Sequence, residues 1–258
     1  MPGRVAIVTG AGGDIGRAIA ATLLADGYAV LVADIREGAA RATAEALKGE
    51  GRVVEASACD ITDLASVAAM AATARGLGAV VALVNNAGGV TSASLQEATA
   101  GDFRADLALN LEGAFNVFKA VEADLKANRG AIVNIASVNG LGVFGHPGYS
   151  AAKAALIHLT HMLAVEYGKF GRRANAVAPG TVATAAWRAR AEANPNVFEE
   201  ARRWYPLGRV ARTEDIANAV SFLLSDKAAA ITGVCLPVDC GLTAGLADLA
   251  RTFTQSSD

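Results

Sequence analysis

A phenol and an ammonium group lie where they could share a proton-transfer site. Tyr149 and Lys153 are four residues apart, and the segment that follows them, through Glu166, has the apolar spacing of an amphipathic helix. Residues at this spacing lie on one face of a helix, about one turn apart. Tyrosine has an unperturbed pKa of about 10, and a neighbouring cation favours the phenolate and lowers that pKa. The pair could therefore act as a general acid and base toward an alcohol or a carbonyl near neutral pH. The alternative is a buried tyrosine beside a surface lysine.

A nucleotide site is predicted near the N-terminus. Residues 5–8 form a short apolar run, as expected of a strand that is buried on both faces of a parallel sheet. A glycine-rich segment, 9–16, follows it, and residues 15–24 have helical apolar spacing. Such a turn from strand to helix brings backbone N–H groups and the positive end of the helix toward a phosphate. The alternative is a simple tight turn.

The next apolar run indicates which nucleotide is bound. Residues 29–33 end at Asp34, which lies 18 residues beyond Gly16. In a dinucleotide-binding fold, an acid at this place accepts hydrogen bonds from the ribose of the adenosine and repels a 2′-phosphate. Arg36 slightly favours NADP instead, because a nearby arginine can accommodate the 2′-phosphate of that nucleotide. We therefore expect NAD as the cofactor.

These features resemble the short-chain dehydrogenase/reductase family over residues 4–243. The glycine pattern of the family, T-G-x-x-x-G-x-G, is matched by Thr9, Gly10 and Gly16, but Asp14 replaces the middle glycine. An acid at a helix N-terminus suits the helix dipole, whereas an acid that faces a pyrophosphate would repel it. Further family motifs are matched by Asn85-Asn86-Ala87-Gly88, Asp60, Asn110, Ser137, Pro179-Gly180, 206–209 and 238–241.

The resemblance implies a hydride transfer between NAD and a carbinol carbon. Tyr149 would take the hydroxyl proton, Lys153 would lower the pKa of Tyr149 and bind the nicotinamide ribose, Ser137 would donate to the substrate oxygen, and Asn110 would hold a water. The catalytic residues implied are thus Asn110, Ser137, Tyr149 and Lys153. The cofactor-binding residues implied are Gly10, Gly13, Asp14, Ile15, Gly16, Asp34, Ile35, Asp60, Ile61, Asn86, Ala87, Gly88, Tyr149, Lys153, Pro179, Gly180, Val182 and Thr184.

Strands and helices alternate along the chain. This predicts a single α/β domain, residues 1–258, with a doubly wound (Rossmann-like) parallel sheet and its site at the carboxyl ends of the strands. The segment of about 185–210 interrupts the alternation, and we interpret it as a helical substrate lid. The predicted strands are 4–9, 29–33, 52–57, 80–84, 131–136, 174–178 and 234–238.

Composition argues against several classes of function. The net charge of −2 suggests no nucleic-acid partner, and no apolar run approaches the length of a membrane span. The N-terminus has no pattern of a secretory signal, and three cysteines are a sparse set, so a cytoplasmic location is expected. His158 and His161 are spaced as the start of a metal site, but no third ligand is evident, and we expect no metal.

The substrate is predicted to be a small polar molecule, such as a sugar or a polyol. The lid is rich in arginine, which binds anionic groups bidentately, although the lid could equally be a solvated segment with internal ion pairs. Long aliphatic residues are scarce in the loop before Tyr149. The candidate substrate-binding residues are Ser137, Asn139, His146, Tyr149, Trp187 and Arg188, and Asn139 and His146 could instead hold their own loop.

The assembly and the competing functions complete the predictions. Helical segments near 100–126 and 150–168 are apolar on more than one face, and the family resemblance then implies a homo-tetramer, with a dimer as the alternative. Three other functions fit the same fold: a 3-oxoacyl-thioester reductase, against which Asp34 argues; a non-catalytic nucleotide-binding protein; and a non-redox enzyme such as an epimerase.

Overall fold

Seven parallel strands form one sheet at the centre of the protein. In the computed structural model, which describes residues 3–185, 187, 192, 194, 196, 200 and 202–254, the strands are arranged in the order β3-β2-β1-β4-β5-β6-β7. The predicted doubly wound α/β fold is confirmed. The strands are β1 (Arg4–Thr9), β2 (Ala29–Asp34), β3 (Val54–Ala58), β4 (Ala79–Asn85), β5 (Ala131–Ile135), β6 (Arg173–Pro179) and β7 (Cys235–Val238).

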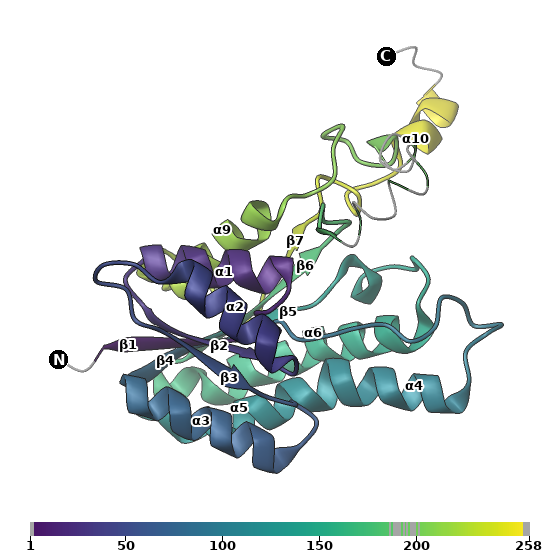
Figure 1. Cartoon of the computed structure of the whole chain (residues 1–258). Coiled ribbons are helices and arrows are strands. Elements are labelled where there is room, and N and C mark those ends of the chain that lie inside the picture. Colours follow the sequence, from purple (N-terminus) through teal and green to yellow (C-terminus); the bar gives the residue numbers. More distant parts are fainter. Residues whose placement is uncertain are drawn as a thin grey trace.

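Helices cover both faces of this sheet (Figure 1). One face carries α1 (Asp14–Ala25), α2 (Glu37–Leu47) and α9 (Thr213–Leu224). The other carries α3 (Leu64–Leu77), α4 (Ala100–Leu107), α5 (Gly113–Ala127) and α6 (Pro147–Tyr167). A further short helix, α10 (Ala247–Thr254), lies apart from the sheet near the C-terminus.

The two faces have separate apolar cores because side chains alternate along each strand. In β1, Val5 and Ile7 belong to the core under α3 and α5, whereas Ala6 and Val8 belong to the core under α1 and α9. All four are fully buried. An uninterrupted apolar run is therefore what a strand between two helical layers requires, and this run is what made β1 predictable.

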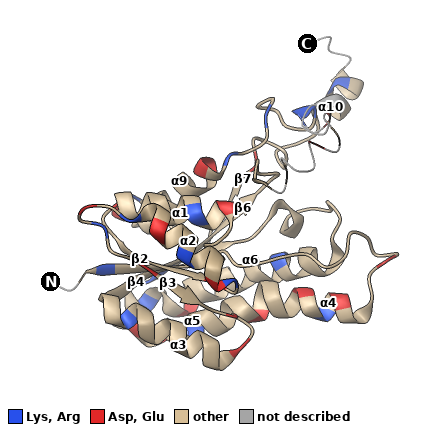
Figure 2. Cartoon of the chain, viewed as in Figure 1, with Lys and Arg blue, Asp and Glu red and all other residues tan. Residues whose placement is uncertain are grey.

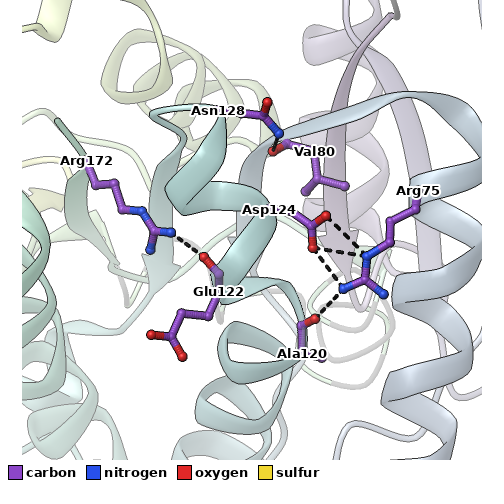
Figure 3. A network of polar contacts seen from close by, with 7 residues as sticks. All are labelled: Arg75, Val80, Ala120, Glu122, Asp124, Asn128 and Arg172. Atoms are coloured by element: carbon purple, nitrogen blue, oxygen red, sulfur yellow. Dashed lines mark hydrogen bonds and ion pairs between the residues drawn. The ribbon is translucent and has the colours of Figure 1, made fainter. Parts of the chain in front are cut away.

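Polar contacts tie the helical layer of α3 and α5 together. Arg75 of α3 forms a bidentate ion pair with Asp124 of α5 and also donates to the carbonyl of Ala120 at 2.7 Å (Figure 3). On the other side of α5, Arg172 donates to the carbonyl of Glu122. These contacts fix α5 against its neighbours at the end of the sheet opposite the candidate site.

Charged side chains lie mostly on the helices and loops around the sheet (Figure 2). Within the described residues, no helix is long and apolar enough to cross a membrane. Of the predicted lid, only some residues between 185 and 202 are described, so its helical character lies outside what the structure describes.

Candidate functional site

The candidate site begins where the order of the sheet reverses. Connections from β1 go outward to β2 on one side, and β4 continues the sheet on the other side, so the carboxyl ends of β1 and β4 flank a crevice. Thr9, the last residue of β1, accepts hydrogen bonds through its hydroxyl from the N–H groups of Asn86 and Ala87, at 3.0 and 3.1 Å. Asn86 in turn donates to the carbonyls of Thr9 and Gly10. The two loops that border the crevice are thereby held to each other.

The glycine-rich loop fits a nucleotide cradle because side chains cannot enter it. A Cβ at Gly16 would lie 2.5 Å from the carbonyl oxygen of Gly10, and one at Gly10 would lie 2.7 Å from Cα of Ala87. Gly10 also has a φ of +64°, a conformation that favours glycine. The backbone thus packs closely under the N-terminus of α1, where N–H groups and the helix dipole attract a phosphate.

A cavity of about 480 Å³ opens over this loop. Most of the predicted cofactor-binding residues line it, which fits a dinucleotide laid across the ends of β1, β2 and β4. Its walls are Gly10, Gly13, Asp14, Ile15, Gly16, Asp34, Ile35, Arg36, Cys59, Asp60, Ile61, Asn86, Ala87, Gly88, Leu109 and Thr184.

Asp34 lies at the end of β2 and is 6% exposed. Its Oδ2 accepts a hydrogen bond from the N–H of Gly12 at 3.0 Å, and its Oδ1 accepts one from the N–H of Arg36 at 3.0 Å. The Arg36 side chain pairs with the same carboxylate at 3.3 Å but remains two-thirds exposed. The carboxylate is therefore held in place at the rim where an adenosine ribose would lie.

The acid that departs from the family pattern, Asp14, is the first residue of α1 and lines the first cavity. Its Oδ1 pairs with Arg17 at 3.1 Å, and its Oδ2 accepts a hydrogen bond from the N–H of Ala185 at 2.5 Å. The carboxylate thereby joins the cofactor loop to the first residue of the predicted lid. Its charge is countered by Arg17 and by the positive end of α1.

A second cavity, of about 470 Å³, adjoins the first and shares Ile15, Asn86, Gly88 and Thr184 with it. The remaining residues that line it are Gly89, Val90, Ile135, Ala136, Ser137, Val138, Asn139, Phe144, His146, Tyr149, Lys153, Pro179, Gly180, Thr181, Val182, Trp187, Tyr205 and Leu242. Three of the four predicted catalytic residues and most of the predicted substrate residues therefore meet in one place.

The predicted effect of Lys153 on Tyr149 is not what the structure shows. Burial raises the pKa of Tyr149, a hydrogen bond with Ser137 lowers it, and the charge of Asp106 raises it, so that the net direction is upward. The ammonium nitrogen of Lys153 lies 5.4 Å from the centroid of the Tyr149 ring and donates to the carbonyl of Ile135 at 2.7 Å. Burial also lowers the pKa of Lys153, to about 8. The expectation of a lowered tyrosine pKa was wrong because it left out the cost of burying a charged phenolate.

Asn139 and His146 both line the second cavity, and both also hold loops. Asn139 donates to the carbonyl of Gly145 at 3.0 Å and accepts from the hydroxyl of Ser137 at 3.2 Å. His146 adopts a φ of +55° just before α6, and its Nδ1 lies 3.0 Å from the carbonyl oxygen of Ser92. Their ring and amide groups are thereby fixed at the border of the cavity.

Asn110 lies beneath the cavities and does not line them. It is 1% exposed and belongs to a π-helical turn, Ala108–Glu112, between α4 and α5. Its amide accepts from the N–H of Gly89 at 3.2 Å and donates to the carbonyls of Gly89 and Asp106 at 2.8 and 2.9 Å. A Cβ at Gly88 would meet both Oδ1 of Asn110, at 2.6 Å, and Nζ of Lys153, at 3.3 Å. Asn110 and Lys153 therefore converge on one point of the loop after β4.

Two arginines of the predicted lid fall where the structure gives no description. Arg188 and Arg190 lie outside the described residues, so their place relative to the cavities is not described. Thr181 lies between the predicted residues Gly180 and Val182, so its place in the sequence could have identified it as a residue of the second cavity. Leu109 lines the first cavity, and Tyr205 and Leu242 line the second. Tyr205 belongs to the segment interpreted as a lid, whereas no sequence signal marked Leu109 or Leu242.

The two histidines of α6 lie next to each other on the helix. The rings of His158 and His161 contact each other edge to face at 6.1 Å. Among the described residues, no group of three or more histidine, cysteine or acidic side chains is placed to hold a metal ion.

Known proteins resemble this chain along nearly its whole length. A family model described as enoyl-(acyl carrier protein) reductase matches residues 10–243. The 2-(S)-hydroxypropyl-CoM dehydrogenase 3 of Xanthobacter autotrophicus is 38% identical over 250 residues, which cover 95% of this chain and 98% of the relative. The D-threitol dehydrogenase of Mycolicibacterium smegmatis is 37% identical, and the matched residues cover 94% of this chain and 94% of the relative. The crystal structure of an oxidoreductase of the short-chain dehydrogenase/reductase family from Burkholderia thailandensis has a TM-score of 0.92 and 46% identity, with 100% of this chain and 99% of that one covered.

Proposed function

The chain belongs to the short-chain dehydrogenase/reductase family of NAD(P)-dependent oxidoreductases, and we propose that it transfers a hydride between NAD(H) and a small, polar secondary alcohol or ketone. The observation that carries the proposal is the meeting of Ser137, Tyr149 and Lys153 in one cavity that shares walls with the cavity over the glycine loop. A proton-transfer group and a cofactor cradle in contact are what such a reaction requires.

The preference for NAD over NADP rests on Asp34. Both of its carboxylate oxygens are already fixed by backbone N–H groups, so the carboxylate cannot turn aside to admit a 2′-phosphate. Arg36 could counter this repulsion, but its side chain pairs with Asp34 itself. The negative charge at the rim therefore favours the ribose hydroxyl over the phosphate.

The residues that line the first cavity would hold NAD, which would supply a hydride acceptor for the carbinol carbon. Residues of this chain would transfer the hydroxyl proton and bind the substrate oxygen. Tyr149 removes the hydroxyl proton in oxidation and returns it in reduction. Ser137 hydrogen-bonds the substrate oxygen and steadies the charge that develops there. Lys153, held by the carbonyl of Ile135, places its amino group 5.4 Å from the centroid of the Tyr149 ring, where it would also bind the nicotinamide ribose. Asn110 holds the loop that carries Gly88 and Gly89 against these groups.

The size and lining of the second cavity support a small substrate with polar groups. At about 470 Å³ it is near the lower end of ligand pockets. Asn139, His146 and Thr181 bring polar groups to its wall, while Phe144 and Trp187 provide apolar surface. We propose a sugar or a polyol as the substrate class. We also propose that the protein is located in the cytoplasm and assembles as a homo-tetramer.

The test is the formation of NADH from NAD with a panel of polyols, sugars, hydroxy acids, steroids and acyl-thioester alcohols. The proposal expects polar alcohols to exceed hydrophobic ones in kcat/KM. A tenfold advantage of hydrophobic alcohols would contradict the substrate class. Turnover only with NADPH and a 3-oxoacyl thioester would favour the reductase alternative. Conversion of an alcohol without net NADH would indicate an epimerase, and binding of NAD without turnover of any compound would indicate a non-catalytic protein.

The predicted arginines of the lid provide a second arm. Arg188→Ala and Arg190→Ala are compared with wild type on anionic and neutral alcohols at matched concentration. An anionic substrate that binds through this segment predicts a higher KM for the anionic alcohol alone. Equal KM values in all three proteins would place the arginines outside the substrate site.

A further inference from the structure

Asp106 is a buried carboxylate at the candidate site that the mechanism above does not use. It lies on α4, one helical turn before Asn110, and is 1% exposed. Its Oδ1 accepts a hydrogen bond from the N–H of Thr91 at 3.0 Å. Its Oδ2 is buried and has no hydrogen-bond partner among the described residues. A charged oxygen buried without a partner costs free energy, so packing alone does not account for this side chain.

The free oxygen of Asp106 faces the first turn of α6. A Cβ built on Gly148 would lie 2.8 Å from Oδ2 of Asp106, so α4 and α6 approach each other closely here. Gly148 is the second residue of α6 and directly precedes Tyr149. The positive end of a helix dipole favours a carboxylate at such a place. The dipole of α6 therefore offsets part of the cost of burying this charge.

The same residue is connected to two other parts of the site. Its backbone carbonyl accepts a hydrogen bond from the amide of Asn110 at 2.9 Å. Thr91, which donates to its side chain, belongs to the loop after β4 that also contains Gly88 and Gly89. Asp106 thus contacts the loop that borders the cofactor cavity, the turn that carries Asn110 and the turn that carries Tyr149.

We propose that Asp106 is a positioning residue of this site, which ties the loop after β4 to α4 and places a negative charge beside the first turn of α6, directly before Tyr149. The proposal rests on the proposed function of Tyr149 as the acid and base. The charge of Asp106 acts on the pKa of Tyr149 in the same direction as burial, which is the larger effect, and against the hydrogen bond with Ser137. A phenol that keeps its proton favours donation to a ketone over removal of a proton from an alcohol at neutral pH.

The other ionisable groups near Tyr149 do not duplicate this charge. The loop of residues 88–93 and the segment of residues 137–145 contain no ionisable side chain. Two ionisable residues other than Tyr149 lie at the first turns of α6, His146 and Lys153. The other neighbouring ionisable residues are Asp102 and Arg104 on α4 and Glu112 on the π-helical turn that carries Asn110. Asp102 is engaged in the capping box of α4 with Thr99. Removal of the charge at Asp106 therefore removes a repulsion that disfavours the phenolate of Tyr149.

The decisive experiment is an absorbance titration of the Tyr149 phenolate, which needs no substrate. The trace of Tyr149→Phe is subtracted to isolate this residue from the other tyrosines. Asp106→Asn keeps the shape of the side chain and the acceptor for Thr91, and removes only the charge. The expected result is a midpoint that moves to lower pH than in wild type. Glu112→Gln, which removes an exposed carboxylate on the turn after Asn110, is the matched control and should leave the midpoint where it is.

Stability and activity measurements separate a structural role from the proposed one. Asp106→Ser, which is smaller and can still accept from Thr91, is the second variant in case the amide does not fit against Gly148. If both variants lower Tm and neither moves the Tyr149 midpoint, Asp106 is only structural and the proposal is wrong. A midpoint that moves to higher pH also overturns it. A downward shift in a protein that turns over no alcohol or ketone would support the placement of this charge and contradict the proposed function alone.

Discussion

The loop after β4 offers a sharp test of how the candidate catalytic groups are positioned. Gly88 lies where Asn110 and Lys153 converge, and a Cβ at this residue would be 2.6 Å from Oδ1 of Asn110 and 3.3 Å from Nζ of Lys153. Carbon and oxygen normally approach to about 3.3–3.6 Å. In Gly88→Ala the amide of Asn110 must therefore retreat by roughly 0.7–1 Å, or the loop must move by the same amount.

A displacement of this size has a large expected effect on rate. A misplacement of about 1 Å can cost on the order of 100-fold, so we expect kcat/KM of Gly88→Ala to fall about 10- to 100-fold, or about 1.4–2.7 kcal/mol of transition-state stabilisation. Asn110 also makes three hydrogen bonds to Gly89 and Asp106, and their distortion should lower Tm. The assay is steady-state NADH formation with the alcohol that the substrate panel identifies.

The next residue provides a matched control. A Cβ at Gly89 would meet only the end of the Leu109 side chain, at 3.3 Å, and a flexible side chain can move aside. Gly89→Ala keeps the backbone groups that bind Asn110, so we expect its kcat/KM to stay within about twofold of wild type. Equal activity of Gly88→Ala and Gly89→Ala would refute the reasoning, because the contact of Gly88 with Asn110 and Lys153 would then have no catalytic consequence.

Four further predictions concern the cofactor, the base, stability and assembly. Tyr149→Phe should bind NAD normally and lose about two or more orders of magnitude in kcat, which single-turnover kinetics can check; near-normal turnover would remove it as the base. Wild type should prefer NAD over NADP by about tenfold or more in kcat/KM, or about 1.4 kcal/mol, and Asp34→Ala should narrow this ratio. Burial lowers the pKa of Lys153 to about 8, whereas an ordinary lysine has a pKa of about 10.4. Between these two pH values the folded state binds fewer protons than the unfolded state. The free energy of unfolding of wild type, relative to that of Lys153→Met, should therefore rise with pH across this window. Denaturant unfolding at several pH values measures this difference, and a pH-independent difference would contradict it. Met162 and Val165 on α6 are exposed and should be covered in a tetramer. Light scattering should then give four times the chain mass, and the double variant Met162→Lys, Val165→Lys should give a lower mass. A monomer mass for wild type at micromolar concentration would exclude the tetramer.

The sheet was predictable because its central strands are apolar on both faces. β1, β2 and β5 are buried at nearly every residue, and a continuous apolar run is the pattern that such burial demands. The edge strand β3 was placed less well, since it begins at Val54 and not at residue 52. Val53 is half exposed, and the limits of an edge strand depend on where it pairs with β2 more than on its own pattern.

The location of the candidate site was predictable for a different reason. Parallel strands bring their carboxyl ends to one edge of the sheet, so Asp34, Asn86 and Ser137 had to lie along that edge once the strands were assigned. Contacts between distant segments were not predictable. Asp14 reaches Ala185 across 171 residues, and the π-helical turn that carries Asn110 follows a helix with no sequence signal for an insertion.

The electrostatics of the site could not be read from spacing, because burial decides them. Tyr149 and Lys153 are on one face of α6, as their spacing predicts, yet burial penalises the charged form of each group. A tyrosine with a raised pKa and a lysine with a lowered pKa differ more in proton affinity than the free residues do, whose pKa values are about 10 and 10.4. The phenol therefore holds its proton more firmly than the spacing alone suggested, and a protonated phenol is the form that donates to a carbonyl. The proposed effect of the Asp106 charge acts in the same direction as burial.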